Sequence, residues 1–321
     1  MTDVRRWIAG PCAVLLLCAG LAASAAADPL AVLAAIKGRV QVARGSATAR
    51  AAGFGSALER GDRVIVPAGG SATVFFNDGN VVELAEKSSI TIGGQVASKP
   101  RLGPGGELSS EVYSNVSRFV TGGSAQTGLV AMARVRGTDT STPILLAPRN
   151  TGVLASRPSF SWRAVEGATR YRLAISDDQG ARWSRETTAL ALDYPADAES
   201  LAAGGEYLCE LEALSDHGSL RTESSSFEVL RAADAGAVLA SLERIRATAG
   251  AESPAGHFLA GSYLFGHRLY DDAARHFQAL ARLSPESSAP HNALGKVYQD
   301  QGLMDLAAEE FHRAYSLAST P

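Results

Sequence analysis

The histidines are the side chains in this sequence that are best suited to bind a metal ion. There are six of them: His217, His257, His267, His276, His291 and His312. Neither the H-E-x-x-H spacing of a zinc helix nor a paired cysteine–histidine spacing occurs among them. We therefore expect no metal site. His257 and His291 lie 34 residues apart, at matching places in a repeated segment, and are expected to be half-buried packing residues.

The residue types of a serine hydrolase stand next to one another in Ser215-Asp216-His217-Gly218. A catalytic triad is normally assembled from distant positions, and the nucleophile elbow G-x-S-x-G does not occur in the sequence. Aspartate and glycine favour turns, so this tetrapeptide is expected to close a β-hairpin. Gly103–Gly106 and Gly122–Ser124 lack the lysine of a phosphate loop. Asp177-Asp178 lacks the alternating oxygen ligands of a calcium loop. The sequence thus predicts no enzyme, no catalytic residue and no bound cofactor.

The N-terminus has the order of a secretory signal. An Arg-Arg pair precedes an apolar run, Trp7–Leu21, which leads into the small residues of AASAAAD. A basic start, a short apolar segment and an A-x-A site are typical of a cleaved signal peptide. The alternative is a membrane anchor, but a spanning helix needs about 20 mostly apolar residues. We assign residues 1–27 to the signal, with cleavage after Ala25 or Ala27. We expect the mature protein in a bacterial periplasm, without a membrane span.

The cysteine count argues against an internal disulfide, and the charge argues against a nucleic-acid partner. Cys209 is the one cysteine that follows the signal segment, so no internal disulfide can form. Its place in the alternating run EYLCELEAL predicts a buried apolar role. The chain has 30 Lys and Arg against 33 Asp and Glu, a net charge of −3. No basic block stands out, so a nucleic-acid partner is not expected.

Residues 28–139 are expected to form an all-β domain. VQVA at 40–43 and DRVIVP at 62–67 alternate apolar and polar residues, as half-buried strands do. Within residues 71–92, Asn77–Asn80 places turn-forming residues between two further alternating runs, which predicts a β-hairpin. Strands this short and this regularly spaced are typical of a small sandwich, barrel or β-roll.

This first domain resembles the FecR-like periplasmic domain, named for the regulator of iron-dicitrate transport. The resemblance rests on Gly38-Arg39-Val40, Leu58-x-x-Gly61-Asp62-x-Val64, the run from Ala72 to Leu84, and Arg136-Gly137-Thr138. It covers roughly a third of the chain. In the iron regulator a cytoplasmic anti-sigma segment and a membrane span precede the domain. Here a signal peptide comes directly before it, so transmembrane control of a sigma factor is not expected.

A proline-containing linker at 140–156 is expected to lead into a second β domain, residues 157–231. RPSFSWRAVEGATRYRLAISDD supplies two strands, and GEYLCELEAL and SSFEVL supply later ones. Alternation predicts that four residues face the core: Trp162, Tyr171, Leu173 and Ile175. The stretch resembles the fibronectin type III-like sandwiches, which implies about seven short strands in two sheets.

The end of the chain repeats itself at a spacing of 34 residues, as 254–287 and 288–321. Matching pairs are Gly261 and Gly295, Ala273 and Ala307, and Phe277 and Phe311. This period, with small residues where helices cross, resembles the tetratricopeptide (TPR) family and implies helical hairpins. Leu294-Gly295-x-x-Tyr298 matches the family pattern closely, whereas the first copy has Ala260 and Leu264 at the leucine and tyrosine positions.

The segment 232–253 before the repeats has an apolar helical stripe and is expected to be a capping helix. Two repeats fall below the usual minimum of about three for independent stability. The cap helix, the sandwich or a second subunit must therefore cover their exposed faces.

The TPR resemblance also implies which side chains line a concave groove. These partner-binding positions are Phe258, Ser262 and Phe265 in the first copy and Asn292, Lys296 and Gln299 in the second. One copy offers aromatic contact, and the other offers hydrogen bonds and a positive charge. The combination suits a peptide segment with an acidic group near Lys296. The alternative is that these residues pack against the cap helix or are solvated.

The sequence as a whole predicts a non-catalytic periplasmic protein of modular β plus α architecture. Its repeats are expected to dock an envelope protein or peptide, in a scaffolding, assembly or signalling role. The alternative is binding of an envelope polysaccharide or peptidoglycan through the β domains. Exposed aromatic residues at one rim of the first domain would favour that alternative, and the residues on offer are Phe54, Phe75, Phe76, Tyr113 and Phe119.

Overall fold

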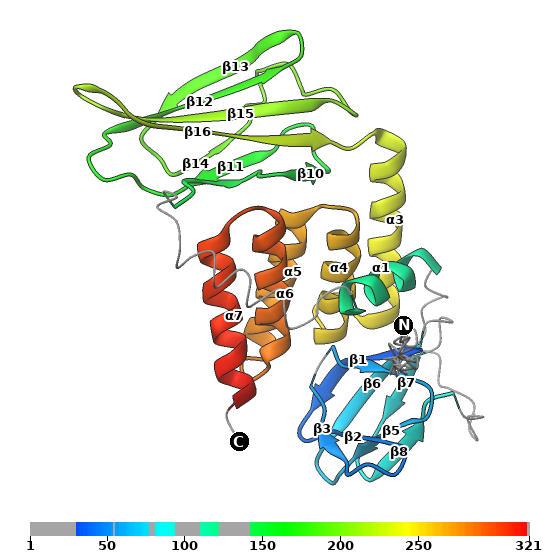
Figure 1. Ribbon diagram of the computed structural model, residues 1–321. Coiled ribbons are helices and arrows are strands. Elements are labelled where there is room, and N and C mark those ends of the chain that lie inside the picture. The colour runs from blue at the N-terminus through cyan, green and yellow to red at the C-terminus, as the bar shows by residue number, and fades with distance from the viewer. Residues whose placement is uncertain (1–29, 54, 77–80, 94–109, 122–141, 320–321) are drawn as a thin grey trace, which may run out of the picture.

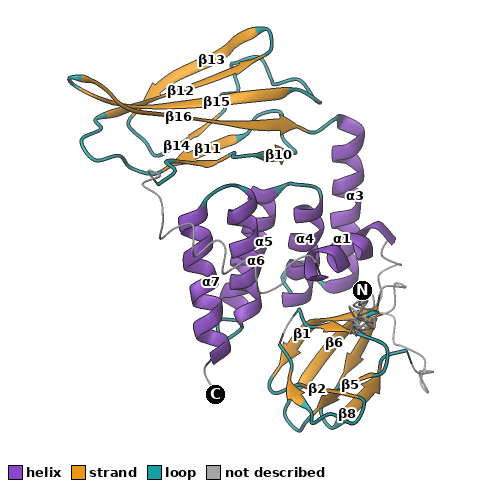
Figure 2. Ribbon diagram, viewed as in Figure 1, coloured by secondary structure: helices purple, strands orange, loops and turns teal. Residues whose placement is uncertain are grey.

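The computed structural model describes residues 30–53, 55–76, 81–93, 110–121 and 142–319. The expected mixture of β and α structure is confirmed, with two β domains on either side of a group of helices (Figure 1). Figure 2 shows the helices as a layer between the two β domains. None of the described helices is both long enough and apolar enough to cross a membrane. The signal segment and Arg136-Gly137-Thr138 lie outside the described residues.

The N-terminal β domain consists of two four-stranded sheets with the orders β4-β1-β6-β7 and β3-β2-β5-β8. The strands are β1 (Ala31–Lys37), β2 (Gln41–Arg44), β3 (Arg50–Ala51), β4 (Ala57–Leu58), β5 (Asp62–Val66), β6 (Ser71–Phe76), β7 (Val81–Leu84) and β8 (Ser88–Thr91). Alternation places Val64 and Val66 in the core and Arg63 outside it. β6 and β7 pair antiparallel, as the predicted hairpin requires, although its turn, 77–80, lies outside the described residues.

One segment of this domain corrects the all-β prediction for 28–139, because α1 (Ser110–Thr121) is a helix. Val112, Val116 and Phe119 recur at i, i+4 and i+7, which places them on one face of the helix, and all three are buried. A helix of 12 residues is marginal in water by itself. It therefore depends on packing against distant elements, which no local pattern reveals.

The second β domain is a sandwich of two sheets, with the orders β10-β16-β15-β12-β13 and β14-β11-β9. The strands are β9 (Leu145–Ala147), β10 (Thr151–Val153), β11 (Ser159–Trp162), β12 (Arg170–Asp177), β13 (Gly180–Thr187), β14 (Ala191–Asp193), β15 (Glu206–Ser215) and β16 (Gly218–Val229). The four predicted core residues and Cys209 are buried. Ser215 pairs with Gly218, so the predicted hairpin turn is confirmed.

The expected linker at 140–156 belongs in large part to this sandwich. β9 pairs antiparallel with β11, and β10 pairs parallel with β16. Each of the two strands has three residues, too few for an alternation of apolar and polar side chains to show in the sequence. The sandwich therefore begins near Ile144, whose side chain is already part of its core.

The remaining helices are α3 (Ala232–Ala249), α4 (Pro254–Gly266), α5 (Tyr270–Leu283), α6 (Ser288–Asp300) and α7 (Met304–Ser319). α4 pairs with α5 and α6 with α7, and the two hairpins are offset by 34 residues. We call them the helical repeats. Ser253 caps α4, since its Oγ accepts a hydrogen bond from the Gly256 amide at 2.9 Å. α3 packs against α4 through Val238 and Ile245, in the position expected of the cap helix.

The N-terminus of α5 is capped by a residue of the sandwich. The local N-cap residue, Leu269, makes no side-chain cap hydrogen bond. The buried Thr151 of β10 takes that role. Its Oγ1 accepts from the Tyr270 amide at 2.9 Å and donates to the Arg268 carbonyl at 2.9 Å. At the other hairpin, Arg149 Nε and Asn150 Nδ2 donate to the Gln301 carbonyl at 3.0 and 3.1 Å. The turns of both hairpins are thus fixed to one edge of the sandwich.

Thr151→Val is expected to lower the free energy of unfolding by about 1–2 kcal/mol, because it leaves the first amide of α5 buried without an acceptor. Urea unfolding followed by circular dichroism measures the loss. Thr151→Ser keeps the hydroxyl and serves as the matched control. Equal stability of the valine and serine variants would contradict a capping role.

Candidate functional site

The predicted groove of the helical repeats is occupied by the chain's own helix α1. In Figure 1, α1 crosses in front of α4. Its apolar face, Val112, Val116 and Phe119, belongs to the same buried cluster as Phe258 of α4 and Leu294 of α6. Three of the six residues predicted to bind a partner, Phe258, Phe265 and Lys296, therefore contact a helix of the chain itself.

Phe119 makes the aromatic contacts of α1. Its ring stacks on Phe277 with centroids 5.2 Å apart, and it meets Phe265 edge-on at 4.9 Å and Phe258 at 6.3 Å. We call these four residues the aromatic cluster. Phe277 comes from α5 and passes α4 at Gly261, where a Cβ atom would lie 2.7 Å from its ring. The glycine thus lets an aromatic side chain of the second helix reach the groove.

Gly261→Ala is expected to destabilise the protein by about 1–3 kcal/mol, because the added methyl group displaces the Phe277 ring. Gly236→Ala on α3 is the matched control, since a Cβ atom there meets nothing within 4 Å. The control is expected to gain about 0.5–1 kcal/mol from helix propensity. Thermal unfolding of both variants shows whether Gly261→Ala lowers the stability while Gly236→Ala raises it. A stabilised Gly261→Ala variant would refute the close packing.

Lys296 of α6 binds the C-terminal end of α1. Its ammonium donates to the Phe119 carbonyl at 2.9 Å and lies 4.8 Å from the centroid of the Phe119 ring. Burial lowers the pKa of Lys296, while Asp300 acts in the opposite direction. A cation at the carbonyl end of a helix also interacts favourably with the helix dipole. The contact therefore fixes the direction in which a helix lies in the groove.

A polar contact accompanies the apolar face of α1. The buried Asn115 lies with its Nδ2 3.3 Å from His267 Nε2, and the Glu111 carboxylate lies 3.1 Å from the same nitrogen. Asn115 also packs closely against α4, since a Cβ atom on Gly266 would lie 2.5 Å from Asn115 Oδ1. The groove thus accepts an asparagine between two valines of a helix.

The six predicted groove residues do not behave alike. Phe258, Phe265 and Lys296 converge on Phe119, as described above. Ser262 is fully buried and Gln299 half-buried; Ser262 Oγ and Gln299 Oε1 have no hydrogen-bond partner among the described residues. Asn292 is exposed on α6. Phe277 was not predicted as a groove residue, and α1 was not predicted at all. The i, i+4, i+7 spacing of its apolar residues was the signal present in the sequence.

The first β domain forms a further wall beside the groove. Val32, Ala34 and Phe75 belong to the same buried cluster as the helices. Phe75 and Phe119 are therefore not available as exposed aromatic residues on a rim for sugar binding. Phe54 lies outside the described residues, as does the side chain of Tyr113.

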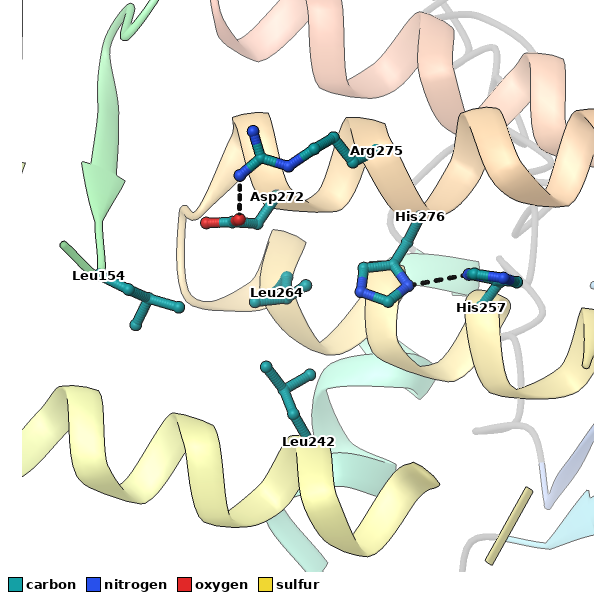
Figure 3. Close-up of a pocket in the computed structure, with 7 residues that line it drawn as sticks. All are labelled: Leu154, Leu242, His257, Leu264, Asp272, Arg275 and His276. Atoms are coloured by element: carbon teal, nitrogen blue, oxygen red, sulfur yellow. Dashed lines mark hydrogen bonds and ion pairs between the residues drawn. The ribbon is translucent and has the colours of Figure 1, made fainter. Parts of the chain in front are cut away.

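A second feature is a pocket of about 280 Å³ between the sandwich and the first hairpin (Figure 3). It is lined by Leu154, Leu242, His257, Leu264, Asp272, Arg275 and His276. The two histidines face each other with their Nδ1 atoms 3.0 Å apart. Two such nitrogens share one proton, so one ring donates and the other accepts. Among the described residues, no group of three or more His, Cys, Asp or Glu is arranged to hold a metal ion.

The second repeat has the equivalent contact, with a carboxylate in place of the second histidine. His291, 34 residues after His257, lies with its Nδ1 2.6 Å from the carboxylate of Glu310, 34 residues after His276. The expectation that His257 and His291 are packing residues is met, since both rings are buried between paired helices. In the first repeat, burial and then the neighbouring His257 lower the pKa of His276 to about 4. His276 is thus neutral at pH 7.

No family model matches the sequence, and no curated protein matches it. Solved structures of fibronectin type III-like domains are similar to its β part. The fn3 domain of human collagen alpha-1(XX) chain is 15% identical over 30% of this chain and 95% of that chain, with a TM-score of 0.22. The fibronectin(III)-like modules of Clostridium thermocellum CbhA are 13% identical over 61% and 79%, with a TM-score of 0.22. CopC from Methylosinus trichosporium OB3b is 18% identical over 28% and 95%, also with a TM-score of 0.22. Similarity at this level says nothing about a ligand or a partner.

Proposed function

We propose that the protein is a non-catalytic, modular binding protein of the cell envelope. Two β domains hold the helical repeats, and the groove of the repeats docks a segment of a partner protein. The observation that carries the proposal is the occupancy of this groove by α1. The aromatic cluster and Lys296 bind a helix at both its apolar face and its carbonyl end. A groove with this lining is suited to an amphipathic helix, which inserts apolar residues at i, i+4 and i+7.

The envelope location rests on the N-terminal export pattern, Trp7–Leu21 followed by AASAAAD. The non-catalytic role rests on the sequence, in which no acid–base or nucleophile constellation has the required spacing. A scaffolding or assembly role then follows from the architecture, because repeat hairpins present surfaces to other chains.

Photo-crosslinking in intact cells tests the proposal with the full chain. A photoreactive residue at Asn292, exposed beside the groove, is expected to give one adduct of defined mass. The same residue at Leu208, exposed on the sandwich, is the control position. Lys296→Glu should abolish the Asn292 adduct, because it places a negative charge at the carbonyl end of a bound helix. An identical adduct from both positions, or one that Lys296→Glu leaves unchanged, would refute groove docking.

A further inference from the structure

We propose that α1 is an internal substitute for the partner, so that the groove binds a helix of a second protein only when that helix displaces α1. The partner helix carries the face that α1 presents: an aliphatic residue, an asparagine, a second aliphatic residue and a phenylalanine. In α1 these positions are Val112, Asn115, Val116 and Phe119. This inference rests on the proposed function and adds to it the chemistry of the partner and the control of access.

The apolar part of the pattern is set by how closely the groove fits α1. Within the aromatic cluster, Phe119 contacts the rings of Phe258 and Phe265 on α4 and of Phe277 on α5. Val112 and Val116 are both buried in the cluster formed with α4. A helix with a polar residue at the Phe119 position would bury that group among phenylalanines without a partner, which is unfavourable.

The polar part of the pattern comes from Asn115 and Lys296. Asn115 contacts His267 and packs against Gly266, where an added Cβ atom would lie 2.5 Å from Asn115 Oδ1. Lys296 reaches the carbonyl of Phe119, so the carbonyl end of the incoming helix must lie at α6. The groove therefore selects both a sequence pattern and a helix direction.

Three properties of α1 suit it to exchange. It has 12 residues, a length at which an isolated helix is marginal in water. Its opposite face is solvated, since Ser114 and Arg118 are exposed. Its described residues pack mainly against α4. A longer partner helix would make these contacts and add others along α6, where Asn292 is exposed.

A peptide of residues 110–121 provides the probe. A hydrocarbon staple between positions 114 and 118, both exposed and one turn apart, holds it helical without touching the apolar face. The control peptide has Phe119→Asp. Fluorescence anisotropy measures the binding of both peptides to the full chain.

The displacement model requires a difference between two variants. Val116→Asp/Phe119→Asp releases α1 from the groove, and Ser114→Asp adds a charge to the exposed face of the same helix. We expect the first variant to bind the stapled peptide at least tenfold more tightly than the wild type. The Ser114→Asp variant should bind like the wild type, and the control peptide should bind to none of them. Equal affinity of wild type and released variant, or no binding to either, would overturn the proposal.

Hydrogen exchange tests the displacement of α1 in the wild-type chain, so it does not depend on whether the released variant folds. Saturating peptide is expected to increase exchange in α1 at least tenfold while α4 stays protected. Unchanged exchange in α1 would overturn the proposal. A wild-type dimer that disappears on Phe119→Asp would assign the groove to a second copy of the chain and would also overturn it.

The two proposals can fail separately. If the peptide exchanges with α1 but no adduct forms at Asn292 in cells, the displacement of α1 is supported and the docking of an envelope partner is refuted. If an adduct forms at Asn292 but α1 keeps its protection in the presence of peptide, the docking function stands and the displacement of α1 is wrong.

Discussion

Replacing Phe277 by alanine is expected to lower the free energy of unfolding by about 3–5 kcal/mol, which is the usual range for a buried phenylalanine. Phe277 is fully buried and joins α5 to α4 and α1 at a single point. Its removal leaves a cavity whose walls belong to paired helices and cannot easily collapse. Urea unfolding of the full chain measures the effect. Phe277→Leu keeps most of the side-chain volume, so its free energy of unfolding should fall clearly less than that of Phe277→Ala.

A double variant tests whether Gly261 and Phe277 act together. The alanine methyl group at position 261 clashes only while the ring is present. Gly261→Ala/Phe277→Ala should therefore be more stable than the sum of the single effects predicts. Additive losses would show that the two residues contribute independently and would contradict the packing described above.

Acid is expected to weaken the fold through His276. Its pKa of about 4 in the fold lies below the ordinary value of 6.5, so the unfolded chain binds the proton more readily. The stability associated with neutral His276 is complete above about pH 6.5 and is lost as the pH falls towards 4. The loss amounts to about 3 kcal/mol in total. The charged form of His276 is disfavoured first by its burial and then by the neighbouring His257.

His276→Gln is the control for this effect, because its amide can donate or accept a hydrogen bond to His257 and does not titrate. Unfolding free energies at pH 7, 5.5 and 4 should fall more steeply for the wild type than for the variant. Burial raises the pKa of Asp271 to about 6, which stabilises the fold as the pH falls. That contribution is present in both proteins and cancels in the difference. Parallel pH profiles would contradict the prediction.

Much of the fold could be predicted from periodicity. Alternation located the core positions Tyr171, Leu173 and Ile175, and the 34-residue period located both hairpins. The three-residue strands β9 and β10 could not be found this way, because they contain too few residues to alternate. They are held by partners more than ten residues away, whose positions depend on the finished sandwich.

Of the six positions that the repeat pattern predicted to line a groove, Phe258, Phe265 and Lys296 contact α1. Their binding of a partner protein stays a prediction. The identity of that helix depends on a contact between segments far apart in the chain, and one sequence carries no record of such pairings. The helical spacing of Val112, Val116 and Phe119 was visible but lay next to a run of strands, which favoured a β interpretation.

The bond between Lys296 and Phe119 joins positions 177 residues apart. During synthesis, α1 therefore leaves the ribosome long before α4 and α6 exist to cover it. The contact can form only after Lys296 has been synthesised. The newly made chain thus has an interval in which the apolar face of α1 is open and the groove is still incomplete. A chain truncated before residue 254 would leave the apolar face of α1 without the helices that cover it.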